Sequence, residues 1–262
     1  MSSAIHTGVA HRGWTRLLPS PWRDRVDWKY GADTGGIIPA AELDAETPNL
    51  AFSNCYRATL GWVIRLFIRR LPVDVARCSF VDFGSGKGRA LLVASEFAFQ
   101  RVLGIEFSPA LHAVALDNIA RLPARRRARV RSILGDAMQF ALPQGNLVCY
   151  LYNPFGPPVF DAVMERIAAH ARSGHDVFVI YINPRHRDLV EHSGAFETVF
   201  EHRKGVIYRA VAAGRSGTRR APKRPPLPTA ARLTLLIWSA LLAAGAILLT
   251  GLFDPSVLGI GL

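Results

Sequence analysis

A glycine-rich turn follows an apolar run in the first half of the chain, and an acid stands just before it. The stretch reads Phe80-Val81-Asp82-Phe83-Gly84-Ser85-Gly86-Lys87-Gly88-Arg89. Glycine has no Cβ, so a ligand can approach the main chain of such a turn closely. A helical pattern begins near Ala90, and the first turn of a helix offers unpaired N–H groups. These features predict a site for a nucleotide-like ligand between a strand and a helix.

The elements that would position this turn alternate along the chain. The predicted strands are Ser79–Phe83, Arg101–Glu106, Val130–Leu134, Leu147–Tyr152 and Val177–Ile182, followed by a hairpin of Phe196–Glu201 and Val206–Val211. Helical patterns separate them, for example from Ser108, a good cap, through Pro109. This alternation predicts an α/β fold with a doubly wound, mostly parallel sheet. Ligands bind such sheets at the carboxyl ends of the strands, where polar residues gather here.

The turn resembles motif I of the class I S-adenosylmethionine (SAM) dependent methyltransferases, because the acid precedes the first glycine by two residues. The string from Asp82 to Gly88, with Gly104-Ile105-Glu106, is also similar to the branch of non-SET protein-lysine methyltransferases. The resemblance covers residues 79–210. It implies a Rossmann-like, seven-stranded sheet whose last strand is antiparallel, with SAM as the cofactor.

The resemblance assigns roles around the cofactor. Asp82 is expected near the methionine amino group, Glu106 at the two ribose hydroxyls, and Asp136 at the adenine amino group. The full set of predicted cofactor-binding residues is Asp82, Gly84, Ser85, Gly86, Gly88, Glu106, Phe107, Asp136 and Ala137. Glu106 as a helix-capping acid, Asp136 as a loop acid and Phe107 as a core residue remain open alternatives.

The segment Asn153-Pro154-Phe155 follows the fourth predicted strand and resembles motif IV of amino-methylating enzymes. That motif is usually Asp/Asn-Pro-Pro-aromatic, so Phe155 stands in place of the second proline. The resemblance implies that the Asn153 carbonyl accepts an N–H from the target amine and directs its lone pair, which is catalysis by positioning. Asn153, Pro154 and Phe155 are the predicted catalytic residues. A rigid loop without a catalytic part is the alternative.

A lysine acceptor makes a further demand on the pocket. Its side-chain pKa is normally about 10.4, so at neutral pH it lacks the lone pair that methylation needs. A desolvated pocket lowers that pKa. Tyr152 and Tyr181, together with Tyr30 from the N-terminal region, are the predicted substrate-binding residues.

Residues 1–70 are predicted to be an N-terminal region ahead of a core at 71–213. Within it, residues 27–36 are polar and aromatic, and indicate either a lid over the pocket or a surface loop. Residues 56–70 have apolar side chains at helical spacing, which predicts an amphipathic helix stopped by Pro72.

The net charge of +12 is concentrated in two places. Residues 121–131 contain six arginines, and residues 214–232 contain six cations, with no acid in either stretch. Local basic patches are therefore indicated, rather than a uniformly basic nucleic-acid surface. The three cysteines are widely spaced and the eight histidines show no ligand spacing, which fits a reducing compartment and predicts no metal site.

The C-terminal part has the pattern of a membrane anchor. Residues 214–232 form a basic, proline-rich linker, residues 233–253 carry no charge, and residues 254–262 form a short tail. A helix over the uncharged stretch would be roughly 30 Å long, the thickness of a bilayer core. The cations on its N-terminal side predict a cytoplasmic catalytic domain. A buried core helix is the alternative.

Together these patterns predict a membrane-tethered SAM-dependent methyltransferase that acts on an amine near the membrane, with protein lysine favoured. Two alternatives remain. One is a nucleic-acid adenine-N6 methyltransferase, favoured by the arginines at 121–131. The other is a binding module that has lost catalysis and senses SAM or a nucleotide.

Overall fold

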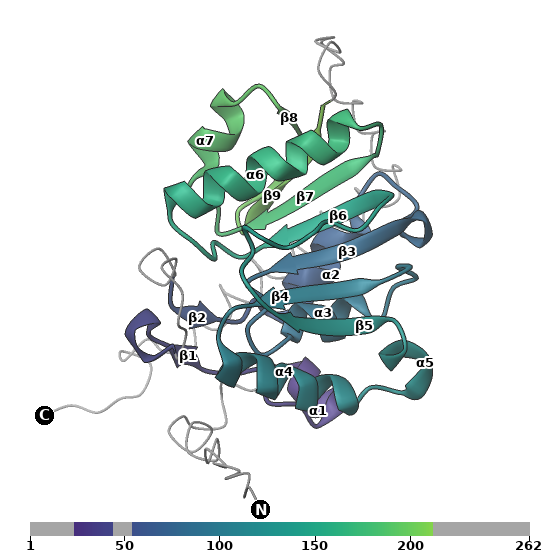
Figure 1. The fold of residues 1–262 in the computed structure, drawn as a ribbon. Coiled ribbons are helices and arrows are strands. Elements are labelled where there is room, and N and C mark those ends of the chain that lie inside the picture. Colours follow the sequence, from purple (N-terminus) through teal and green to yellow (C-terminus); the bar gives the residue numbers. More distant parts are fainter. Residues whose placement is uncertain (1–23, 44–53, 212–262) are drawn as a thin grey trace, which may run out of the picture. The chain divides into compact units, whose positions relative to one another are not determined.

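The computed structural model describes residues 24–43 and 54–211. Its main sheet consists of β3 (Cys78–Phe83), β4 (Val102–Glu106), β5 (Val130–Leu134), β6 (Asn146–Leu151), β7 (Val177–Ile182), β8 (Phe196–His202) and β9 (Gly205–Ala210). The strand order is β5-β4-β3-β6-β7-β9-β8 (Figure 1). Strands β3 to β7 are parallel, and β9 runs antiparallel to both β7 and β8. This confirms the predicted α/β fold, with a seven-stranded, doubly wound and mostly parallel sheet.

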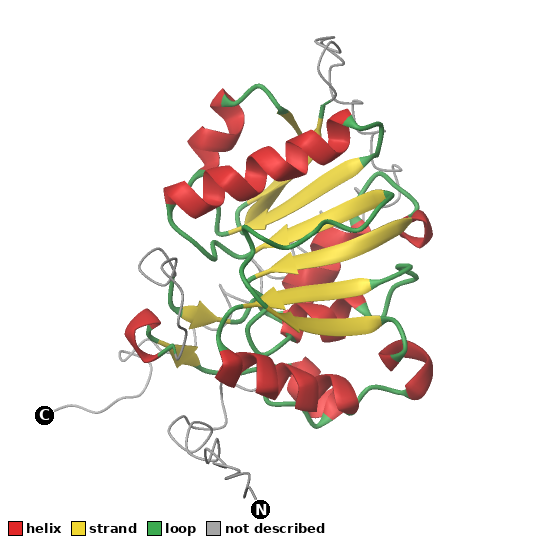
Figure 2. Cartoon of the chain, in the orientation of Figure 1, coloured by secondary structure: helices red, strands yellow, loops and turns green. Residues whose placement is uncertain are grey.

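Helices cover both faces of the sheet (Figure 2). They are α1 (Arg25–Tyr30), α2 (Gly61–Arg69), α3 (Arg89–Ala94), α4 (Pro109–Ala120), α5 (Ala124–Arg127), α6 (Pro157–Arg172) and α7 (Arg187–His192). Short 3-10 turns occupy Ala40–Glu42 and Val75–Arg77. A small hairpin pairs β1 (Ile37–Ile38) with β2 (Tyr56–Arg57) and lies near the carboxyl ends of the parallel strands (Figure 1).

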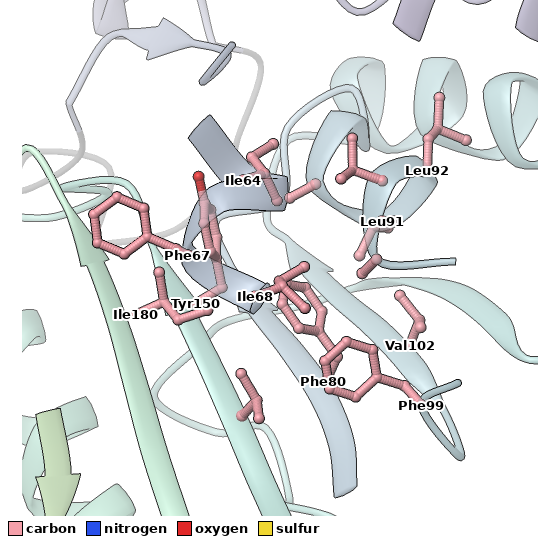
Figure 3. Packing of buried hydrophobic residues seen from close by; sticks show 14 of the residues in the cluster. Ile64, Phe67, Ile68, Phe80, Leu91, Leu92, Phe99, Val102, Tyr150 and Ile180 are labelled. Atoms are coloured by element: carbon pink, nitrogen blue, oxygen red, sulfur yellow. The ribbon is translucent and has the colours of Figure 1, made fainter. Parts of the chain in front are cut away.

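Alternating side chains divide the core into two layers. In β6, Leu147 and Cys149 pack under α6, whereas Val148 and Tyr150 face the layer built by α2 and α3. In that second layer, Phe80 lies 5.3 Å from Phe99 between ring centroids (Figure 3). A strand buried on both sides needs an almost continuous apolar run, which is why the strands were visible in the sequence.

Local signals set several helix boundaries. Ser108 accepts a hydrogen bond from the Leu111 amide, and Pro109 is the first residue of α4, a pairing that suits a helix start. Pro157 is likewise the first residue of α6, where the N-cap Gly156 provides no side-chain bond.

One prediction for the N-terminal region was wrong, and of the two alternatives for residues 27–36 the surface loop does not hold. The helix expected from Tyr56 begins at Gly61, because residues 56–57 pair with β1 instead. The segment 27–36 is also more than a surface loop. It contains the end of α1, and both Asp27 and Thr34 are buried. Tertiary contacts therefore decided the structure of a segment that has no strong periodic pattern.

No helix within the described ranges is long and apolar enough to cross a bilayer. The predicted linker at 214–232, the uncharged stretch at 233–253 and the tail at 254–262 all lie outside these ranges.

Candidate functional site

A cavity lies at the carboxyl ends of β3, β4 and β6. The chain leaves β3 toward β4 on one side and returns through β6 on the other, so this is the switch point where doubly wound sheets bind ligands. The cavity encloses about 630 Å³ of space, open solvent included. Its lining comes from Leu43, Asn54–Thr59, Ile64, Asp82, Gly84, Ser85, Arg89, Ala90, Glu106, Phe107, Leu111, Tyr150, Tyr152 and Pro154.

Two carboxylates at the ends of adjacent strands line this cavity. Asp82 and Glu106 are each 3% exposed. Glu106 accepts hydrogen bonds from the Gly86 amide at 2.6 Å and the Ser108 amide at 2.9 Å. Asp82 has no hydrogen-bond partner for its carboxylate among the described residues. Burial, and then the nearby Glu106, raise the pKa of Asp82 well above its usual value. A pair of buried acids of this kind favours a cationic ligand group beside Asp82.

The glycine turn fits closely under neighbouring residues. Gly86 has φ +52°, and a Cβ there would lie 2.1 Å from a ring carbon of Tyr56. Gly84 has φ +77°, and its Cβ would lie 2.8 Å from Pro154. These glycines were predicted to clear space for a ligand, and the structure adds a second reason for them. Their missing side chains admit Tyr56 and Pro154, which are themselves in the cavity lining.

Ser85 adds an unused polar atom to the same turn. Its Oγ is buried and has no hydrogen-bond partner among the described residues. Ser85 lines the cavity, and unsatisfied buried polar atoms are rare in folded proteins. Its hydroxyl is therefore available to a ligand.

The N-terminal segment is tied to the start of α3 by a buried ion pair. Arg89 Nη2 lies 3.1 Å from Asp27 Oδ2, and both side chains are at most 5% exposed. Arg89 Nε also donates to Thr34 Oγ1 at 2.6 Å, and Asp27 accepts from both the amide and the hydroxyl of Thr34. We call Asp27, Thr34 and Arg89 the clasp. It holds the segment before the sheet against the helix that follows the glycine turn.

A second set of bonds fixes the opposite side of the turn. Lys87 Nζ contacts the Asp33 carboxylate at 3.3 Å and donates to the Gly35 carbonyl at 3.1 Å. Asn118 on α4 donates to the carbonyls of Asp33 and Lys87 at 2.8 and 2.9 Å. The Lys87 side chain therefore points toward the N-terminal segment and contacts Asp33 and Gly35.

A tyrosine pair forms the wall next to β6. Tyr150 lies opposite Asp82 in the strand register, and its hydroxyl donates to Thr59 Oγ1 at 2.7 Å. Burial, and then the Asp82 charge, raise the pKa of Tyr150 well above its usual value, so it remains a neutral donor. Tyr152, predicted to bind substrate, also lines the cavity.

The other residues predicted on the acceptor side lie differently. Asn153 has φ +44°. Its main-chain carbonyl accepts a hydrogen bond from the Asn54 side chain at 2.9 Å, and its side-chain Oδ1 accepts one from the Tyr181 hydroxyl at 3.4 Å. Pro154 lines the cavity, whereas Asn153, Phe155 and Tyr181 do not belong to its lining. Phe155 and Tyr181 are core residues of the α6 layer. Tyr181 therefore contacts Asn153 from the α6 layer of the core and not from the cavity.

Three more predicted residues lie outside the lining. Asp136 follows β5 at the same edge as Glu106, but its carboxylate accepts from the Met138 amide at 2.8 Å, and Ala137 packs in the α6 layer. Tyr30 is farther away, where its hydroxyl donates to Glu96. Of the nine residues assigned to the cofactor, the lining contains Asp82, Gly84, Ser85, Glu106 and Phe107, while Gly86 reaches it through Glu106 and Gly88 caps α3.

Sequence reasoning missed Tyr56, Thr59 and Arg89 as parts of the site. Tyr56 was placed in a helix, and nothing in its neighbours distinguishes it from a core aromatic. Arg89 directly follows the glycine turn, and an arginine at the start of a helix, where cations are disfavoured, was the one available signal for a buried partner.

The described part of the chain contains no cluster of histidine, cysteine and acidic side chains that could hold a metal ion. No protein-family model matches the chain, and no curated protein matches its sequence.

Solved structures of similar fold include several methyltransferases. One is the glycopeptide N-methyltransferase MtfA in complex with SAM, with 14% identity over 60% of this chain and 89% of that chain, at a TM-score of 0.48. Another is an RNA methyltransferase from Salinibacter ruber in complex with S-adenosyl-L-homocysteine, with 21% identity over 60% and 94% of the two chains, at 0.44. A third is the putative RNA methyltransferase PH1948 from Pyrococcus horikoshii, with 16% identity over 67% and 94%, at 0.46.

Proposed function

We propose that the chain is a SAM-dependent methyltransferase that transfers a methyl group to an amine. The observation that carries this proposal is the cavity at the switch point, in which the buried carboxylates Asp82 and Glu106 meet the glycine turn. A ligand with a cationic group, a polar sugar and a flat base matches such a site better than an anionic phosphate does.

The polar atoms around the turn fit SAM group by group. The Asp82 carboxylate, buried and lacking a hydrogen-bond partner in the described ranges, suits the amino group of the methionine part. The Ser85 hydroxyl, also without a partner there, suits its carboxylate. Glu106 already accepts two amide hydrogen bonds, and a carboxylate has further lone pairs for the ribose hydroxyls. Phe107 offers an apolar surface for the base.

Bound SAM would supply an electrophilic methyl group that is already activated, so the protein has mainly to position the acceptor. In this proposal Tyr152 orients the amine, Asn153 holds the acceptor loop through its bonds to Asn54 and Tyr181, and Pro154 sets the position of the loop against Gly84. Burial of the acceptor would lower the pKa of a lysine and favour its neutral form. We favour a protein lysine as the acceptor, because the string from Asp82 to Gly88 resembles that branch of methyltransferases.

Calorimetry with S-adenosyl-L-homocysteine (SAH) tests the cofactor, and transfer of labelled methyl groups to protein or RNA tests the acceptor. Failure to bind SAH and SAM would remove the proposal. Binding without any transfer would favour the sensor alternative, and transfer to RNA but not to protein would replace the lysine assignment.

We also propose that residues 233–253 tether the protein to a membrane with its catalytic domain in the cytoplasm, as their lack of charge predicts.

Cofactor binding should depend on pH through Asp82. Its pKa is raised in the free protein by burial and by Glu106, and a bound ammonium group would lower it again. Below the raised pKa, binding should therefore release a proton, and SAH affinity should rise with pH until it levels off above that pKa. Calorimetry in two buffers with different ionisation enthalpies measures the released proton.

The variant Asp82→Asn is the control, since it should bind SAH more weakly and without that proton. In the free protein, the same raised pKa contributes stability that is fully present below the unfolded value near 3.8 and is lost as the pH rises through the folded value. Affinity that stays independent of pH would contradict the role of Asp82.

We expect the side chain of Asn153 to contribute to turnover, beyond any effect that a substitution has through the positive φ of this position. Replacing it by alanine removes one hydrogen-bonding group from the acceptor loop, so turnover should fall about tenfold while SAH affinity changes little. Asn183 follows β7 with φ +50°, close to the φ of Asn153, but it is exposed, whereas Asn153 is buried and bonded to Asn54 and Tyr181. Asn183→Ala is therefore a control for backbone strain alone, and equal turnover in both variants would contradict the catalytic assignment.

A further inference from the structure

Five exposed arginines gather at the ends where the first parallel strands begin. Arg77 directly precedes β3, Arg101 directly precedes β4, and Arg125, Arg127 and Arg131 surround the start of β5. We call these five residues the arginine edge. The cavity lies at the carboxyl ends of the same strands, so α5 and the hairpin of β1 and β2 mark opposite ends of the sheet (Figure 1).

The charge of the arginine edge is not neutralised within the described ranges. Arg127 and Arg131 donate to main-chain carbonyls, and none of the five forms a salt bridge to a described carboxylate. These bonds to carbonyls orient the guanidinium groups but leave their charge in place.

Acids are scarce in the loops that lead into these strands. The loops before β3, β4 and β5 contain two acids, Asp74 and Glu96. Glu96 forms ion pairs with Lys29 at 2.8 Å and with Arg65 at 2.7 Å. Burial by itself raises the pKa of Glu96, but these bonds outweigh it and lower the pKa to about 2. A strong positive potential therefore remains at this edge.

The described chain ends at the same end of the sheet, although β9 is separated from β3 by β6 and β7. Strand β9 is antiparallel to β7, and Arg209 pairs with Phe178 at the start of β7. Beyond the described residues, the sequence continues with six cations in 214–232 and then the uncharged stretch 233–253. The last described residues therefore lie at the end of the sheet that carries the arginine edge, opposite the cavity.

We propose that the arginine edge docks on an anionic phospholipid surface, so that the cavity opens away from the bilayer. The proposal rests on the membrane association proposed above and gives it a direction. A lipid surface is favoured over RNA because the described chain ends on this side of the sheet and an uncharged stretch of bilayer length follows in the sequence. The acceptor then reaches the cavity from the aqueous side.

Hydrogen–deuterium exchange of the full-length chain on vesicles tests this docking. We compare vesicles of phosphatidylcholine with vesicles that also contain phosphatidylserine. Exchange at residues 124–131 should slow on the anionic vesicles alone. The effect should disappear at about 1 M salt, where the Debye length falls to about 3 Å. Residues 203–204, at the opposite end of the sheet, should exchange equally on both kinds of vesicle.

A triple variant measures the contribution of the arginines. We expect the affinity for anionic vesicles to fall roughly a hundredfold when three arginines are replaced together, by Arg125→Gln, Arg127→Gln and Arg131→Gln. Each cation near an anionic surface contributes about fivefold to that affinity. The matched control replaces Arg185, Arg203 and Lys204, which are exposed beyond the other strand ends, and should dock as the parent does.

Equal exchange on the two kinds of vesicle at low salt would overturn the proposal. So would protection of residues 124–131 by a polyuridine oligonucleotide but not by phosphatidylserine, which would assign the edge to nucleic acid. Calorimetry with SAH on the same samples keeps the two proposals separate. Docking without SAH binding would remove the methyltransferase proposal and leave the arginine edge as a lipid-binding surface.

Discussion

Gly86→Ala should reduce SAH affinity by about a hundredfold. A side chain at a left-handed φ costs about 1–2 kcal/mol, and a Cβ within 2.1 Å of the Tyr56 ring adds a packing strain of about 1–3 kcal/mol. The turn should relieve both by moving, and cofactor binding would have to restore it. The Gly86 amide, which donates to Glu106, would move with it. Calorimetry measures the loss.

Two further variants separate the causes of this effect. Gly174 has φ +99° but nothing within 4 Å of its missing Cβ, and it follows α6 away from the cavity. Gly174→Ala should therefore keep the affinity of the parent. Adding Tyr56→Ala to Gly86→Ala should restore part of the affinity, because the clash is then gone. SAH binding by Gly86→Ala as tight as in the parent would rule out this turn as the cofactor loop.

Arg89→Ala should lower the free energy of unfolding by about 3–5 kcal/mol, the usual cost of leaving one partner of a buried ion pair alone. In this variant the Asp27 carboxylate would remain buried without its cation, and Thr34 Oγ1 would lose a donor. Denaturant unfolding of the full chain measures the loss.

The exposed pair of Arg172 and Glu165 is the control for this prediction, because such surface pairs contribute at most about 1 kcal/mol. Arg172→Ala should therefore unfold nearly as the parent does. Replacing both partners, by Arg89→Met with Asp27→Asn, should recover much of the stability, since no unpaired charge is then buried. Equal losses for Arg89→Ala and Arg172→Ala would mean that the clasp contributes little.

The sheet and its ligand edge were predictable because their signals are local. Strand β5 and strand β7 have the predicted bounds, and the others differ by one or two residues. Each strand is an apolar run between turn residues, and a parallel arrangement follows from the intervening helices. The same reasoning brought Asp82 and Glu106 together, since carboxyl ends of neighbouring parallel strands share an edge.

The rest of the site depends on contacts between distant residues. Helix α1 has six residues, and β1 and β2 have two each, too few for a periodic pattern. Their positions are set by the clasp and by Tyr56, whose hydroxyl donates to the Thr34 carbonyl at 2.9 Å. Asp136 is the converse case. Its strand was predicted correctly, its carboxylate accepts a hydrogen bond from the main chain of its own loop, and its contact with the adenine stays a prediction.

The clasp also orders events during synthesis. Asp27 and Thr34 leave the ribosome well before Arg89, and Asn118, which fastens the same segment, follows later still. The nascent N-terminal segment must therefore wait, unpaired, until the first two strands and the helices after them have emerged. At translation rates of about 5–20 residues per second, that interval lasts several seconds. During it, newly made chains would expose the apolar residues of this segment, such as Val26 and Ala32, which are buried in the finished core.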